Sequence, residues 1–110
     1  MSNPGATGSA TVGDAAGASI RLYAPSPNPF TGHTRLAYAV SVEGQEVDLA
    51  VFDLAGRRVR QLASGVQSVG RHDVEWDGRT DSGRPLEGGV YFLRARVGHD
   101  TRVMPLVHMR

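Results

Sequence analysis

The chain has 110 residues, a formal net charge of +1 and no cysteine. This length has room for one domain, and the balanced charge gives no indication of nucleic acid or another polyanion as partner. The lack of cysteine excludes disulfides, thiolate metal ligands and cysteine nucleophiles. All twelve basic residues are arginines, so catalysis by lysine is excluded too. Apolar runs last only a few residues, so we expect no membrane span.

Residues 1–19 are rich in Gly, Ala, Ser and Thr, with Asp14 the one charged side chain and Val12 the one branched apolar residue. Such a segment cannot bury enough apolar surface to offset the entropy lost on ordering. It also lacks the basic and apolar regions of a secretory signal. We therefore expect a flexible linker or leader over 1–19 and one folded domain over 20–110.

The folded part begins with short alternating segments. A first strand over 20–23 is ended by three prolines between Pro25 and Pro29, since proline disfavours both a helix and a central strand. Residues 34–42 then place Leu36, Tyr38 and every second residue after them on one apolar face, which is the pattern of a half-buried strand.

Later segments repeat this alternation. Asp53 to Gly56 predicts a type I turn with Gly56 in the left-handed conformation, closing a hairpin. Further strands are expected over 47–51, 57–62, 72–76, 90–97 and 101–108. Turn signals recur about every 8–12 residues, and no segment keeps a helical period. The pattern predicts an all-β fold, a seven-stranded antiparallel Ig-like (fibronectin-III-like) β-sandwich.

Several short elements occur in a characteristic order along residues 20–110. They are Pro27-Asn28-Pro29-Phe30, the segment 51–59, the segment 70–78, Asp81-Ser82-Gly83 and the segment 88–94. This series resembles the Ig-like domain of the flagellar hook-capping protein family. It equally resembles the C-terminal sorting domains of type IX secretion substrates in bacteria.

The resemblance implies which residues are recognised. They are Pro27, Asn28, Pro29, Phe30, Gly89, Val90, Tyr91 and Arg110. Sorting domains usually carry a lysine before the last strand, and Arg102 stands at that position here.

The implied function is that of a non-catalytic C-terminal sorting and surface-attachment domain of a secreted bacterial protein, at the cell surface or outside the cell. Its partner would be a protein, either the export and attachment machinery or a neighbouring domain of the parent chain, and no cofactor is expected. One alternative is a structural scaffold like that of the flagellar hook cap. A second alternative is a carbohydrate-binding module.

The Pro27 to Phe30 element has two interpretations that are compatible with each other. A proline-rich turn is preorganised, so binding it costs little ordering entropy, which favours a recognition epitope. The same element can serve as a rigid corner between strands, with Phe30 filling one end of the core. Both roles can hold at once.

The segment from Asp77 to Gly83 faintly resembles a calcium loop. Arg79 stands where an oxygen ligand is needed, and Asx turns at Asp77 and Asp81 explain the sequence equally well. We therefore predict no metal site, with Asp77 and Asp81 as weak candidates.

Trp76 offers a sugar-stacking platform if exposed, but it shares a strand face with Val74, which favours a core position. A cluster of arginines at 57, 58, 60 and 71 suggests an anion-binding patch unless nearby acids such as Asp73 neutralise it.

The four histidines, at positions 33, 72, 99 and 108, show no metal-ligand spacing. His72 and Asp73 are adjacent on a strand and so point to opposite faces, which argues against a catalytic dyad. The sequence also contains no Gly-x-Ser-x-Gly elbow. We predict that the domain is not an enzyme.

Overall fold

A computed structural model describes residues 19–109, which fold into seven β-strands without a helix. The strands are β1 (Ile20–Leu22), β2 (Thr34–Val40), β3 (Glu46–Phe52), β4 (Arg58–Val66), β5 (Gly70–Trp76), β6 (Gly89–Val97) and β7 (Asp100–His108). The described residues therefore form no helix that could span a membrane. The predicted all-β fold with seven strands is confirmed.

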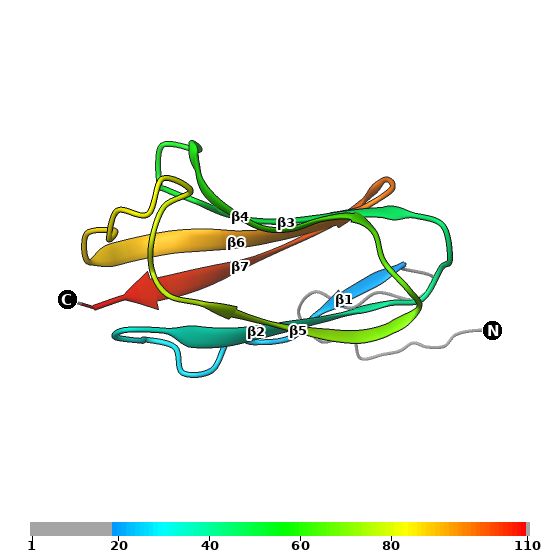
Figure 1. The fold of residues 1–110 in the computed structure, drawn as a ribbon, viewed down its shortest axis with the longest axis horizontal. Helices are drawn as coiled ribbons and strands as arrows, with labels where there is room; N and C mark the ends of the chain where they lie inside the picture. Colours follow the sequence, from blue (N-terminus) through cyan, green and yellow to red (C-terminus); the bar gives the residue numbers. More distant parts are fainter. Residues whose placement is uncertain (1–18, 110) are drawn as a thin grey trace.

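The strands form two stacked sheets. One sheet has the order β1-β2-β5 and the other β4-β3-β6-β7, and every pair of neighbouring strands is antiparallel. Figure 1 shows the two sheets as separate layers, with the strands of each running nearly along the long axis of the molecule. This arrangement is the predicted antiparallel sandwich.

The core lies between the two sheets and is built by the period-two alternation of each strand. Leu36 of β2, Leu49 of β3 and Leu93 of β6 are fully buried. The two residues that flank Leu93 on β6, Phe92 and Arg94, are only partly buried. Successive side chains of a strand point to opposite faces, so every second residue of a strand points into the space between the sheets. Apolar side chains at these positions fill the core.

The predicted turn after β3 is confirmed. The carbonyl of Asp53 accepts a hydrogen bond from Gly56 N at 3.0 Å, and Gly56 has a φ of 86°. Asp53 Oδ1 also accepts hydrogen bonds from the backbone N–H groups of Ala55 and Arg57. The hydrogen bond from Arg57 N is the main reason why the pKa of Asp53 lies below its ordinary value.

The strand β4 is longer than the predicted 57–62. It continues to Val66, which pairs with Glu46, because β3 offers backbone partners over its whole length. Two register shifts in the β3–β4 ladder accommodate the residues by which β4 is longer than β3. Gly65 lies beyond the predicted end of this strand at residue 62, but it is part of β4 in the structure. Tertiary pairing thus outweighs the poor strand propensity of Ser64 and Gly65.

Ser19 links the start of the domain to the β6–β7 turn. Its N–H and its hydroxyl group each donate a hydrogen bond of 2.7 Å to Asp100 Oδ2. These bonds stabilise the charged carboxylate and so lower the pKa of Asp100. Residues 1–18, the bulk of the predicted linker, lie outside the described residues.

The first prediction concerns the core. Leu93→Ala removes a fully buried side chain and should lower the free energy of unfolding by about 2–5 kcal/mol. The matched change Leu54→Ala affects a side chain that is 71% exposed and should alter it by less than about 0.5 kcal/mol. Urea unfolding measures both, and equal losses would contradict the assigned core.

The second prediction concerns pH. A carboxyl group whose pKa is lowered on folding stabilises the domain above its ordinary pKa of 3.8, and this contribution disappears as the pH falls through the lower folded value. Asp100→Asn should therefore make the melting temperature fall less steeply than in the wild type below about pH 4. Identical slopes in thermal melts from acidic to neutral pH would refute the role of Asp100.

Candidate recognition site

The segment from Pro27 to Phe30, here called the proline corner, contacts the outer edge of β7. Backbone groups of Val107 bond away from β6, so the alternation of an antiparallel ladder turns the backbone of Val103 and Pro105 to the same outer side. A proline has no N–H to donate, and at this position none is needed for the ladder with β6. This orientation makes β7 an edge strand that a second segment can cap.

Asn28 is the polar half of that cap. Its Oδ1 accepts a hydrogen bond from Val107 N at 2.9 Å, and its Nδ2 donates to the carbonyl of Pro105 at 3.3 Å. The side-chain amide therefore offers β7 the donor and acceptor that a neighbouring strand would supply. Pro27 and Pro29 on either side of Asn28 are exposed, so their rings remain available at the surface.

Phe30 is the apolar half of the cap. Its N–H donates to the carbonyl of Val107 at 3.0 Å, and its carbonyl accepts from Met109 N at 2.8 Å. The ring is 2% exposed and lies 4.9 Å from the His108 ring and 5.5 Å from Trp76 between centroids. Phe30 thus fills one end of the core, as the corner interpretation predicted.

Residues Gly89 to Tyr91 form the start of β6 and lie on the other side of β7. Gly89 pairs with His108, and Val90 pairs with Val107. The hydroxyl group of Tyr91 donates to the carbonyl of Glu87 at 2.7 Å, and burial raises the pKa of this phenol. Tyr91 is therefore a packing residue, whereas Val90 is 42% exposed.

Two elements far apart in the sequence thus meet on the end of β7. We call the exposed and partly exposed residues of this assembly the corner surface, and they are Pro27, Asn28, Pro29, Val90, Pro105, Val107 and Met109. Figure 1 shows the loop after β1, the start of β6 and the C-terminal end of β7 at the same end of the sandwich. Arg110 lies outside the described residues.

Arg102 does not join this surface. It lies five residues before Val107, or roughly 17 Å along an extended strand. It pairs with Ala95 near the opposite end of the β6–β7 ladder. A basic residue at this position therefore belongs to a different part of the domain from the proline corner.

Pro105, Val107 and Met109 were not predicted from the sequence to belong to a site. A signal for them was present, because proline within a strand is found at sheet edges. Alternation also placed Met104 and Leu106 inward, which left Pro105 and Val107 at the surface. The contact with Asn28 itself joins residues about eighty positions apart and has no local signal.

The acidic loop after β5 has a structural role. Asp77 Oδ1 accepts hydrogen bonds from Arg79 N and Arg60, as an Asx turn requires. Asp81 makes no Asx turn, because its Oδ1 accepts from Gln61 N on β4 and its N–H donates to Val59 O. Among residues 19–109 no cluster of three His, Cys, Asp or Glu side chains could hold a metal ion.

Trp76 is fully buried, and its Nε1 donates to the carbonyl of Arg79 at 2.9 Å. It therefore cannot act as a stacking surface for a sugar in this conformation. Three of the four clustered arginines also form ion pairs with acids, and Asp73 is the one of these acids that was expected to neutralise the cluster. Arg57 pairs with Asp53, Arg60 with Asp77 and Arg71 with Asp73 on its own strand.

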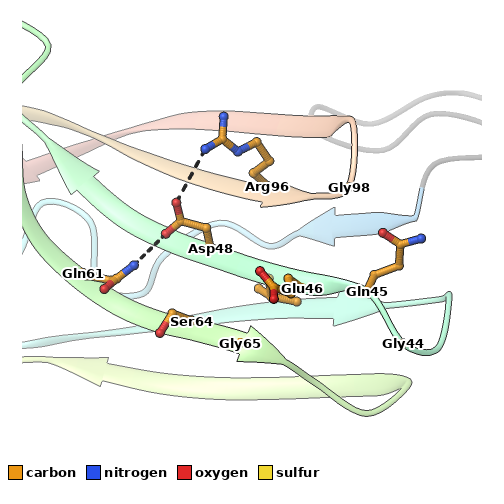
Figure 2. Close-up of a pocket in the computed structure, with 10 residues that line it drawn as sticks. Gly44, Gln45, Glu46, Asp48, Gln61, Ser64, Gly65, Arg96 and Gly98 are labelled. Carbon is orange, nitrogen blue, oxygen red and sulfur yellow. Dashed lines mark hydrogen bonds and ion pairs between the residues drawn. The ribbon is translucent and has the colours of Figure 1, made fainter.

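A polar groove of about 560 Å³ lies on the outer face of the larger sheet, at the end away from the corner surface. Figure 2 shows Asp48 at its centre, bonded by Gln61 on one side and Arg96 on the other. Arg94 approaches the same carboxylate at 3.7 Å. Because both oxygens of Asp48 are engaged by these donors, the carboxylate serves to join β4, β3 and β6.

The described residues thus form a small β-sandwich of two antiparallel sheets. Residues 24–100 match the FlgD Ig-like domain family, and the chain belongs to that family. The resemblance found in the sequence is thereby confirmed. No curated protein matches the chain in sequence.

Solved structures that are similar to the chain include the following two. One is PorZ, described as an essential bacterial surface component of the type-IX secretion system of Porphyromonas gingivalis, with 20% identity and a TM-score of 0.58. The match covers 81% of this chain, which spans 11% of PorZ. The other is FlgD from P. aeruginosa, with 21% identity, a TM-score of 0.53 and coverage of 90% of this chain and 74% of that one. Both support the Ig-like fold.

The third prediction tests the cap on β7. Asn28→Ala removes both side-chain hydrogen bonds and should lower the free energy of unfolding by about 1–2 kcal/mol, whereas Asn28→Asp keeps the acceptor for Val107 N and should cost less. Amide hydrogen exchange of Val107 should accelerate in Asn28→Ala, with the Leu93 amide as internal control. Unchanged exchange at Val107 would show that Asn28 does not hold this edge.

Proposed function

We propose that this domain is a non-catalytic sorting and surface-attachment domain of a secreted bacterial protein, recognised by export machinery at the corner surface. The observation that carries the proposal is that Val107 bonds to Asn28 on one side and pairs with Val90 on the other, and that Asn28 and Val90 are exposed. The family resemblance names the Pro27 to Phe30 and Gly89 to Tyr91 elements as recognised features. Of these elements, Pro27, Asn28, Pro29 and Val90 lie at the surface, whereas Phe30 and Tyr91 are buried.

The physical properties of the corner surface suit recognition by a protein. Its exposed prolines and valines are rigid and apolar, so a partner that covers them gains buried area at little cost in side-chain entropy. The hydrogen bonds of Asn28 and Phe30 fix its shape before any partner arrives. The similarity to a domain of PorZ, a surface component of the type-IX secretion system, supports an extracellular or cell-surface location.

A structural role in a protein assembly is the second candidate, supported by membership of the FlgD Ig-like domain family and similarity to FlgD from P. aeruginosa. In that case the corner surface would contact a neighbouring subunit or a domain of the parent chain. Both candidates use protein contact through a folded β surface, and they differ in whether the domain is sufficient to direct export.

The fourth prediction separates the two. Residues 20–110 fused to a reporter in a host with type IX secretion should be exported, and Val90→Glu should reduce export about tenfold by placing a charge in an apolar contact. The matched control Val66→Glu changes a side chain that is 64% exposed at the opposite end of the sandwich and should leave export unchanged.

Thermal melts of each variant establish that the fold is intact. A folded wild-type fusion that stays inside the cell would refute sorting and favour the assembly role. Full export of folded Val90→Glu would refute the corner surface as the recognised site.

A further inference from the structure

Four strands of the sandwich are sheet edges: β1, β5, β4 and β7. An edge strand presents backbone donors and acceptors to other chains, and proteins usually protect it by short length, bulges, proline, charged side chains or a covering loop. Short length, bulges, proline or a covering segment protect three of the four edges. The fourth, β5, has none of these and carries only charged side chains on its outer face.

The protection of the three edges is visible in each case. The strand β1 has three residues. The strand β7 carries Pro105 and is capped by Asn28 and Phe30. The strand β4 has two register shifts against β3, and Asp81 bonds to its outer side at Val59 and Gln61.

The strand β5 pairs with β2 over all seven residues without a register shift. On β2, the backbone groups of Arg35 and Ala37 form hydrogen bonds on the side of β1. Because successive residues of a strand direct their backbone groups to opposite sides, the even-numbered residues of β2 bond to β5. Arg71, Asp73 and Glu75 therefore direct their backbone N–H and C=O groups to the outer edge. The described residues show no backbone hydrogen bond from the protein to these groups.

The side chains around this edge are also incompletely covered. Val74 on β5 and Val59 and Leu62 on β4 pack against the core but remain partly exposed. On the outer face of the sheet, the side chains of Arg71, Asp73 and Glu75 are more than half exposed, so this edge carries one positive charge followed by two negative ones. An added strand would bury the valines on one face and meet these charges on the other.

We propose that β5 pairs with β5 of a second copy of this chain, joining the two smaller sheets edge to edge. In an antiparallel arrangement centred on Asp73, all seven residues overlap, and Arg71 lies opposite Glu75 of the second copy. The same contact forms twice because the arrangement is symmetric. The two Asp73 side chains face each other. In each copy, the guanidinium of Arg71 lies 3.4 Å from the Asp73 carboxylate of its own strand and offsets this repulsion.

The charge pattern is what favours a second copy as the occupant. A strand suited to this edge needs an acid opposite Arg71 and a base opposite Glu75. The sequence of β5 meets both requirements when it is reversed against itself, and on the inner face it places His72 opposite Val74. Seven residues bury less than a standard interface, so we expect a weak dimer that forms at high concentration or when copies are held close together.

The fifth prediction uses sedimentation equilibrium over a concentration series of residues 1–110. Wild type should show a monomer–dimer equilibrium below about 1 mM, and Asp73→Pro, which removes an outward N–H without touching the β2 ladder, should raise the dissociation constant at least about tenfold. Val103→Pro removes an outward N–H from β7 instead and should leave the dissociation constant unchanged.

Charge reversal gives a second test that does not depend on proline being tolerated. Arg71→Glu and Glu75→Arg should each raise the dissociation constant about tenfold, and an equimolar mixture of the two should dimerise about as well as wild type. Amide exchange at Arg71, Asp73 and Glu75 should slow with rising protein concentration. A wild-type chain that stays monomeric up to about 1 mM, or a mixture that fails to recover, overturns the proposal.

Discussion

The hydrogen bonds between the proline corner and the end of β7 are the constraint on which one end of the sandwich depends. They let Asn28 and Phe30 act as a short neighbouring strand, so the edge of β7 is closed without an eighth strand. They also carry the Phe30 ring to the position where it covers Trp76 and His108. The same contacts therefore close this end of the core and form the corner surface.

Loops that bond to edge strands protect both edges of the larger sheet. Loops that a sequence reader would treat as connections, around Asn28 and around Asp81, lie along the two edges of the larger sheet and bond to them. The smaller sheet has a short strand on one side and the open strand β5 on the other. The domain is thus protected against edge pairing in most directions, and the exposed edge is the one whose charges can discriminate among partners.

Much of this fold follows from the sequence because it depends on local pattern. Alternation gave the inward positions of Leu36 and Trp76, and the Asp53 to Gly56 turn followed from the need for a left-handed residue. The longer β4 did not follow, because its last residues are held by pairing with β3 and have weak propensity of their own. The role of Asp81 was missed for a similar reason, since its carboxylate bonds to Gln61 twenty positions away.

The candidate site shows the same division. Exposure of Asn28 and Val90 was compatible with the sequence, but their positions on the two sides of Val107 depend on strand pairing and have no local signal. The separation of Arg102 from that surface likewise depends on strand register. Residues that look like one motif set in a linear sequence therefore belong to two places on the folded domain.

The position of Trp76 has a spectroscopic consequence. It is the one tryptophan of the chain, it is fully buried, and its ring lies 5.5 Å from Phe30. Detachment of the corner from β7 would let water reach the indole and shift its emission to longer wavelength. The intrinsic fluorescence of this domain is thus an optical reporter of whether the corner is attached to β7.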